Sequence, residues 1–222
     1  MRIDAEGIDY KTLNGQIKEE VRNGEEEITL ANVNGHRYIG AGLDKEEISI
    51  RINGVPGNDL AAFMDGPEIE VEDNAQDAVG NTMNSGKVVI RGHAGDVMGH
   101  SMRGGSIYVE GDAGCRAGIH MKAYKDFFPA VIIGGSVQDF LGEYMAGGLL
   151  VVLGIDRGDF EIVGDNIGTG MHGGEIYVRG SVEDHQLGEE VGIQEPGEED
   201  LKRLRKYLDD YSRCFGHDFS FD

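Results

Sequence analysis

Three of the seven histidines lie beside methionines that recur along the chain: His100, His120 and His172. Imidazole nitrogens bind metal ions and act as general bases, so three histidines on neighbouring segments would suit a metal centre or a catalytic site. Their positions relative to the methionine differ, however: two before it, one before it and one after it. The spacings that zinc ligands usually show are also missing. We therefore predict no metal ligands among them.

Other residue types give no stronger signal for catalysis. His36 and Arg37 follow an Asn-Gly turn and would suit an anion, but a surface or structural role is the favoured interpretation. Cys115 and Cys214 are far apart and form no metal or redox motif, which is typical of unpaired thiols in a reducing compartment. No Ser/His/Asp or Cys/His arrangement is recognisable from the spacing. The sequence predicts no catalytic, cofactor-binding or metal-binding residue.

A glycine-rich run at residues 168–173, Gly-Thr-Gly-Met-His-Gly, matches the bare spacing of a dinucleotide-binding loop. A short strand pattern, Ile176-Tyr177-Val178, follows it where such a loop needs a helix to hold the phosphates. No Gly-Lys-Ser or Gly-Lys-Thr occurs, which excludes a P-loop. We interpret these glycines as corners of a repeated structure.

Six methionines mark an internal repeat, and the gaps between them are 19, 19, 19, 24 and 26 residues. A period near twenty residues indicates stacked coils, each too small to bury its own apolar face. A pair of aliphatic residues two apart follows each methionine. A third apolar ladder, eight residues after the strand position, comprises Leu60, Val79, Met98, Ala117 and Leu141, and Ile167 joins it after an insertion of seven residues. The methionines are Met64, Met83, Met102, Met121, Met145 and Met171.

These ladders predict an all-β protein, a right-handed, single-stranded parallel β-helix of about seven coils over residues 48–182. The aliphatic pair is a short strand with one buried face. The glycine found two residues after most strands would turn a corner with positive φ. An antiparallel sandwich is the rival for a glycine-punctuated pattern, but constant spacing and like-on-like ladders argue against it. A left-handed β-helix would prefer a strict hexapeptide rhythm.

The composition excludes several classes of partner. The net charge is −21, which argues against nucleic acid and against anionic membrane surfaces. No segment approaches transmembrane length, and the N-terminus has no apolar signal core. We expect a cytoplasmic protein.

The two ends differ from the repeat. Residues 1–47 contain a predicted helix and a predicted strand. The helix carries an apolar stripe of Leu13, Ile17 and Val21 and would begin at Thr12 and end at Gly24, and the strand spans 27–33. Residues 183–222 combine an acidic linker with an amphipathic helix at 195–211, which carries Leu201, Leu204, Leu208 and Tyr211 on one side. We expect these pieces to cap the open ends of the column. Docking of the C-terminal helix on a partner is the alternative.

Two insertions interrupt the repeat, one after Met121 and one of seven residues around Asp156 to Glu161. The first contains Phe127 and Phe128 among charged residues, which is typical of interface anchors. The alternative is that both rings fold back onto the column.

The chain resembles the glycine-repeat (GXGXG) domain that ends the large subunit of glutamate synthase. The resemblance covers about residues 27–182. The segments that carry it are 142–148 (GEYMAGG), 151–154 (VVLG), 166–174 (NIGTGMHGG), 176–178 (IYV) and 34–41 (NGHRYIGA). A related domain occurs in one of the subunits of formylmethanofuran dehydrogenase.

The resemblance implies a structural β-helix, because in glutamate synthase this domain holds together a glutaminase domain and a domain with flavin and an iron–sulfur cluster. The chain lacks the N-terminal cysteine nucleophile, the cysteine cluster and the barrel-length region of those domains. It therefore looks like a stand-alone, non-catalytic scaffold subunit of a split glutamate synthase in ammonia assimilation. The implied partners are a glutaminase-type amidotransferase chain and a synthase chain with FMN and an iron–sulfur cluster; a homo-oligomer is also possible.

Two alternative functions stay open. One is the corresponding subunit of a formylmethanofuran dehydrogenase complex. The other is an autonomous β-helix acyltransferase-like enzyme, in which His100 or His120 would be the catalytic histidine between coils of neighbouring subunits.

Overall fold

The protein is built around one sheet of nine parallel strands whose spatial order follows the sequence. The computed structural model describes residues 1–155, 157 and 161–219. The strands are β1 (Arg2–Asp4), β2 (Glu27–Asn34), β3 (Ser49–Val55), β4 (Asp65–Val71), β5 (Ser85–Ile90), β6 (Ser106–Val109), β7 (Ala130–Ile133), β8 (Ala146–Val152) and β9 (Gly173–Val178). The α-helices are α1 (Tyr10–Asn23) and α2 (Glu198–Phe215), and a short 3₁₀ turn, η1, spans Asp184–Gln186. None of the helices in these described ranges is long and apolar enough to cross a membrane.

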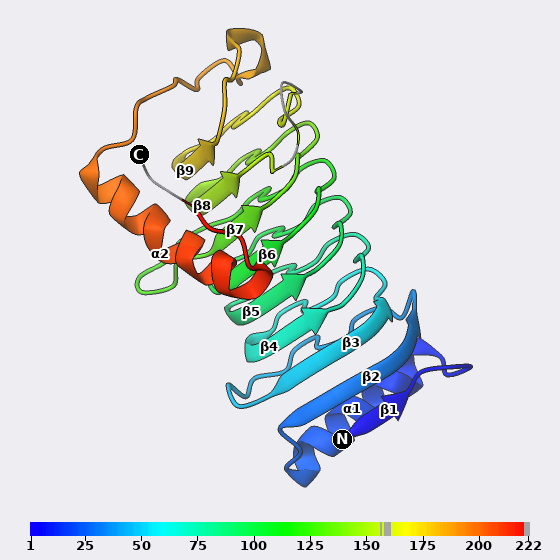
Figure 1. Ribbon diagram of the computed structural model, residues 1–222. Coiled ribbons are helices and arrows are strands. Elements are labelled where there is room, and N and C mark those ends of the chain that lie inside the picture. Colours follow the sequence, from blue (N-terminus) through cyan, green and yellow to red (C-terminus); the bar gives the residue numbers. More distant parts are fainter. Residues whose placement is uncertain (156, 158–160, 220–222) are drawn as a thin grey trace.

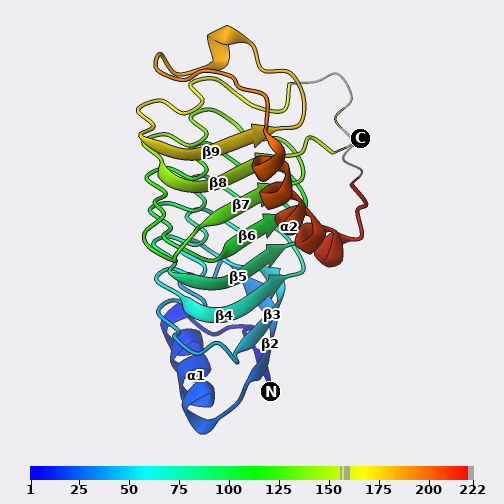
Figure 2. The ribbon, with the colours of Figure 1, turned by 90° about the vertical axis from the view of Figure 1, so that its left-hand side faces the viewer.

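Each strand belongs to one coil of a parallel β-helix, which confirms the predicted fold class. The strands of the repeat are β3 to β9 and enclose about six turns. With the N-terminal end at the bottom, the front strands in Figure 2 run to the right while the chain climbs, so the coils are right-handed. The register stacks like on like: Ile50 on Ile69, Val88 on Ile107, Val131 on Leu150 and Val152 on Val178.

The predicted ladders form the interior of the column. The five repeat methionines Met64, Met83, Met102, Met121 and Met145 are 0% exposed, and Met171 is partly buried at the C-terminal end. The third ladder is also buried and comprises Leu60, Val79, Met98, Ala117, Leu141 and Ile167. The aliphatic repeat is thus a continuous apolar core, which no single coil could form alone.

Helix α1 covers the N-terminal end of the column, as predicted (Figure 1). Its stripe of Leu13, Ile17 and Val21 joins the interior core, and Gly24 ends it in the left-handed conformation. The prediction that Thr12 begins the helix was wrong. Asp9 is the N-cap, because its carboxylate accepts the backbone N–H groups of Lys11 and Thr12.

Helix α2 does not cap the C-terminal end; it lies against the outer face of the sheet (Figures 1 and 2). Leu204, Leu208 and Tyr211 pack on outward-facing residues of β5 to β8, among them Val89, Tyr108 and Ile132. Leu201, predicted on the same side, is 39% exposed. Helix α2 packs on β5 to β8 because of the residue that points outward between the two aliphatic residues of each strand. This residue is charged in β3 (Arg51) and β4 (Glu70) but apolar from β5 onward.

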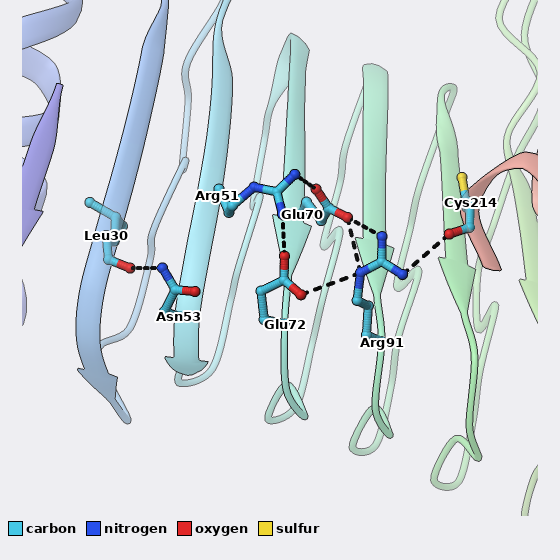
Figure 3. Close-up of polar contacts among 7 residues, drawn as sticks. All are labelled: Leu30, Arg51, Asn53, Glu70, Glu72, Arg91 and Cys214. Atoms are coloured by element: carbon cyan, nitrogen blue, oxygen red, sulfur yellow. Dashed lines mark hydrogen bonds and ion pairs between the residues drawn. The ribbon is translucent and has the colours of Figure 1, made fainter.

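The N-terminal part of the same outer face carries ion pairs in place of a helix. Figure 3 shows the Arg51 guanidinium bound to the carboxylates of Glu70 and Glu72, and Arg91 bound to both of them. Arg91 also donates to the carbonyl of Cys214 at 3.3 Å, which joins the charged strip to the end of α2. These charges neutralise one another within the strip.

The segment that covers the C-terminal end is η1 and the residues after it. The Ile167 N–H donates to the Gln186 carbonyl at 2.8 Å, and the buried Gln186 amide donates to the Val163 carbonyl at 2.8 Å. These bonds satisfy backbone groups of the last coil that would otherwise lack a partner. The prediction that C-terminal residues cap the column is therefore met by 183–188 and not by α2.

The glycines after the strands have two different physical roles. Gly54, Gly154 and Gly180 have positive φ, as predicted for corners. At Gly92, Gly111 and Gly135 the prediction was wrong, because none of them has positive φ. There a Cβ would meet a polar side-chain atom of the preceding coil at 2.3 to 2.6 Å.

Those side chains build polar ladders along the corners. The Asp112 N–H donates to Nδ1 of His93 at 2.8 Å, and the Ser136 N–H donates to Oδ1 of Asp112 at 2.7 Å. In a second ladder, the Cys115 N–H donates to Oδ1 of Asp96 at 2.8 Å. Because the glycines have no side chain, they leave space for these acceptor atoms. The hydrogen bonds that the acceptors form then join successive coils.

Of the two insertions, the first lies wholly within the described residues. Phe127 is 47% exposed, whereas the Phe128 ring stacks on Tyr207 of α2 with 6.4 Å between ring centroids. One ring thus folds back and the other faces solvent. The second insertion, at 156–161, lies outside the described residues except for 157 and 161.

Candidate functional site

A second surface of the column is formed by turns in which every other residue is left-handed. In one coil these are Asp59, Ala61 and Phe63, with φ of 62°, 59° and 56°. The same triplet recurs in the following coils. We call this surface the turn face. Its first column is Tyr38, Asp59, Ala78, Val97, Arg116, Phe140 and Asn166; its second column is Phe63, Thr82, Ser101, His120 and Tyr144.

The central residue of most triplets is a glycine three residues before the methionine, with φ between 67° and 73°. A Cβ at Gly118 would lie 2.7 Å from the Leu150 side chain, so a larger residue would displace that side chain and would be strained at φ 73°. This glycine was the missed signal: Gly80, Gly99, Gly118, Gly142 and Gly168 keep a constant distance from the methionines.

The outer positions of the triplets carry bulky side chains at some conformational cost. Left-handed φ is uncommon outside glycine and is a marked outlier for β-branched or large residues. At the two ends of the β-helix the second column of the turn face holds glycines, Gly42 and Gly170. Between them it holds larger residues, among them His120 and Tyr144. Such residues cost on the order of 1 kcal/mol each and concentrate at functional sites. The turn face is therefore the candidate functional surface.

Two of the predicted histidines meet on this surface. The ring centroids of His100 and His120 are 6.1 Å apart, and Tyr144 stacks on His120 at 5.2 Å with an interplanar angle of 15°. His172 occupies a different register position, directly after Met171. Among the described residues, no group of three or more His, Cys, Asp or Glu could hold a metal ion. The offsets noted in the sequence thus separate His172 from the other two.

The His100 imidazole is partly buried, and this burial disfavours its charged form. Its Nδ1 lies 3.2 Å from Oδ1 of Asn81, and Nε2 lies 3.4 Å from the Ser101 hydroxyl. Burial, and secondly the nearby His120, lower the pKa of His100 below the ordinary 6.5, while Asp59 acts weakly in the opposite direction. The folded protein thus binds this proton less readily than the unfolded chain, so the associated stability is full above pH ~6.5 and is lost as the pH falls.

We expect two substitutions to move the His100 pKa in opposite directions. His120→Asn removes a neighbouring positive charge and should raise it, whereas Asp59→Asn removes a negative charge and should lower it further. Titration of the imidazole resonances by NMR measures both shifts. A shift of the same sign in both variants would contradict this account of the site.

Arg116 and Glu143 brace the same surface. The Arg116 Nε donates to Oε2 of Glu143 at 2.9 Å, and the guanidinium lies 4.6 Å from the Phe140 ring centroid. Glu143 is only 9% exposed, so this ion pair is what makes burial of its carboxylate tolerable. The pair connects two adjacent coils.

Other residues singled out in the sequence have structural positions. His36 is buried, accepts the Asn34 N–H at Nδ1 and bonds the Ile8 carbonyl through Nε2, which supports the structural interpretation. The run at 168–173 is a turn followed by β9 and not by a helix, as interpreted. Cys115 and Cys214 are free, and burial raises the pKa of the Cys214 thiol.

A shallow hollow of about 300 Å³ lies between α2 and the sheet, where sequence reasoning predicted nothing. Tyr108, Phe128 and Tyr207 line it. The Tyr108 hydroxyl donates to Oδ2 of Asp210 at 2.9 Å, and Arg213 also bonds that carboxylate. Its polar groups are thus largely paired within the chain.

Comparison with known proteins shows where similar chains occur. The model of a protein family described as the GXGXG motif matches residues 8–220. An uncharacterised protein of Methanocaldococcus jannaschii is 51% identical over 218 residues, which are 96% of this chain and 84% of that protein. Ferredoxin-dependent glutamate synthase 2 of Synechocystis sp. is 33% identical over 175 residues, which are 71% of this chain but 10% of that enzyme.

Among solved structures, a chain of the formyltransferase/hydrolase complex from Methylorubrum extorquens, determined with methylofuran, has the same fold. The TM-score is 0.69 over 94% of this chain and 83% of that chain, at 21% identity. Both resemblances read from the sequence are confirmed at the level of domain and fold.

Proposed function

This chain belongs to the GXGXG motif family, and on that premise we propose that it is a non-catalytic scaffold subunit of a split glutamate synthase. The observation that carries the proposal is the 33% identity to a glutamate synthase over 71% of this chain. The matched part is 10% of that enzyme, so the remaining functions would belong to other chains. The partners would be a glutaminase-type amidotransferase chain and a flavin-containing synthase chain.

The residues of this chain fit a scaffold and do not fit the expected iron–sulfur cluster. An iron–sulfur cluster is usually held by four cysteine thiolates, and the whole sequence has two cysteines. The cluster would therefore reside on the synthase chain, and FMN is proposed to bind the same chain. What this chain supplies is a column with a continuous core and backbone bonds between successive coils, on which two partners would keep a fixed separation.

The proposal predicts that glutamine-dependent glutamate formation requires all three chains. We expect this chain to co-elute with the amidotransferase and synthase chains of the same organism, and glutamate formation to fall at least tenfold when it is omitted. With ammonia in place of glutamine, the synthase chain should depend far less on this chain, because no ammonia has to pass between chains. No association and no effect of omission would overturn the proposal.

A second candidate is a component of a formyltransferase/hydrolase-type complex, favoured by the fold likeness over 94% of this chain. At 21% identity that likeness concerns the fold alone, and so it ranks below the glutamate synthase relation. Stable association with the chains of such a complex, and none with the amidotransferase, would reverse the order.

A further inference from the structure

As in the run at 202–206 of α2, basic residues outnumber acidic ones in the stretch from Val97 to Lys125. It contains Arg103, Arg116, Lys122 and Lys125 against Glu110 and Asp112, in a chain with 41 acidic and 20 basic residues. Glu110 and Asp112 follow β6 at the opposite end of the strand from Arg103. Arg116 is already paired with Glu143. Arg103, Lys122 and Lys125 are left as the cations that face solvent.

The coil register brings Arg103 and Lys122 together. Each follows a buried methionine, and the Arg103 N–H bonds the Met83 carbonyl as the Lys122 N–H bonds the Met102 carbonyl, both at 2.9 Å. They therefore occupy the same position on adjacent coils, about 4.8 Å apart along the column. Both are exposed, and neither forms an ion pair with any residue in the described part of the chain. The cations of the charged strip in Figure 3, in contrast, are neutralised by carboxylates.

Exposed aromatic rings of the first insertion lie beside these cations. A Cβ at Gly104 would meet the Phe127 ring at 3.2 Å, which places that ring against the residue after Arg103. Phe127 is 47% exposed and Tyr124 is 59% exposed, with the Lys125 ammonium 5.1 Å from the Tyr124 ring centroid. The Tyr124 and Phe127 backbones bond each other in both directions, so the loop is held in shape.

We propose that this patch of Arg103, Lys122, Tyr124, Lys125 and Phe127 docks an acidic segment of a partner protein, one that also carries an apolar side chain. Aromatic and arginine side chains dominate binding energy at protein interfaces. Three cations stand here against one carboxylate, Asp126, while the chain as a whole carries a net charge of −21. An acidic segment would be repelled by the acidic parts of the surface and attracted here, and the exposed rings of Tyr124 and Phe127 offer a contact to its apolar side chain. Charge and rings together therefore favour docking at this patch. The inference deepens the proposed function, since it names the face that a partner chain would occupy.

The test uses the full chain and a short labelled peptide of glutamates around one central phenylalanine. Fluorescence anisotropy should show binding that weakens with salt and falls about tenfold in the Arg103→Glu/Lys122→Glu variant. Lys18→Glu/Lys202→Glu makes the same change in net charge at exposed sites outside the patch and should leave binding within about twofold. Phe127→Ser should weaken binding, whereas Phe63→Ser, at another exposed ring, should not. Unchanged thermal unfolding of each variant shows that it is folded.

Equal binding by both charge variants would overturn the inference, as would no binding to the wild type. Equally tight binding of an oligouridylate of the same length would overturn it as well, because the patch would then read phosphate and not an acidic protein segment. The assembly assay separates this result from the proposed function. If the three chains assemble normally around Arg103→Glu/Lys122→Glu, the docking patch is refuted while the scaffold stands. If the wild type binds the peptide but no synthase chains, the scaffold is refuted and the patch stands.

Discussion

Replacing Gly114 with alanine should lower the free energy of unfolding by about 3 kcal/mol. A Cβ at this position would lie 2.1 Å from Oδ1 of Asp96 and 2.9 Å from the Asp96 backbone nitrogen. The carboxylate would have to leave the site where it accepts the Cys115 N–H. Since each coil rests on its two neighbours, the displacement would weaken the stack on both sides.

Denaturant unfolding of Gly114→Ala measures this loss, and Gly15→Ala is the matched control. Gly15 lies in α1 with nothing within 4 Å of the added Cβ, so alanine should stabilise the protein by up to about 1 kcal/mol. Asp96→Ala in both backgrounds completes a double-mutant cycle, in which the loss in the double variant should be smaller than the sum of the two single losses. A Gly114→Ala protein within about 0.5 kcal/mol of wild type would refute the packing argument.

Replacing Tyr211 with alanine should release α2 while the column stays folded. Tyr211 is 0% exposed, contacts the rings of Tyr108 and Phe215, and its hydroxyl donates to the Val109 carbonyl at 3.2 Å. Loss of such a ring costs about 4 kcal/mol. The cluster beneath α2 is distinct from the interior core of the column, so we expect the cost to fall on the helix alone.

Hydrogen exchange followed by mass spectrometry distinguishes release of α2 alone from unfolding of α2 and the column together. Amides of α2 should lose at least about 100-fold in protection, and amides of β5 to β8 should keep theirs. Tyr211→Phe, which removes only the hydroxyl, should cost about 1 kcal/mol and leave the helix in place. Equal loss of protection in helix and strands would show that the two clusters unfold as one unit.

The column could be predicted from the sequence because its period is written in several independent ladders. Met83 and Met102 fix the spacing, and the aliphatic pairs fix which face is buried. The position of α2 required a comparison that crosses coils: the outward residue changes from Glu70 to Val89, and that change marks where the sheet needs a cover. The amphipathic pattern of α2 shows that one side of the helix is buried, but it does not show which surface that side packs against.

The candidate surface was harder to predict than the fold. His100 and His120 stand at different distances from their methionines, yet their ring centroids lie 6.1 Å apart. Left-handed backbone angles such as φ 53° at Tyr144 cannot be predicted from the residue type, because the same register position in other coils holds threonine or serine. Rotamers and left-handed turns are set by packing between coils, which a single repeat does not contain.

The parallel pairing of every strand in order makes the column a ruler. Its length grows only in whole coils, and each adds about 4.8 Å along the axis without disturbing its neighbours. Insertions such as the one carrying Phe127 loop outward and leave this scale unchanged, since Val109 still pairs with Ile133 across it. Two proteins held at different heights would thus have a separation counted in coils. Removing one 19-residue unit would bring them closer by a single step, because the register of all other strands would be kept.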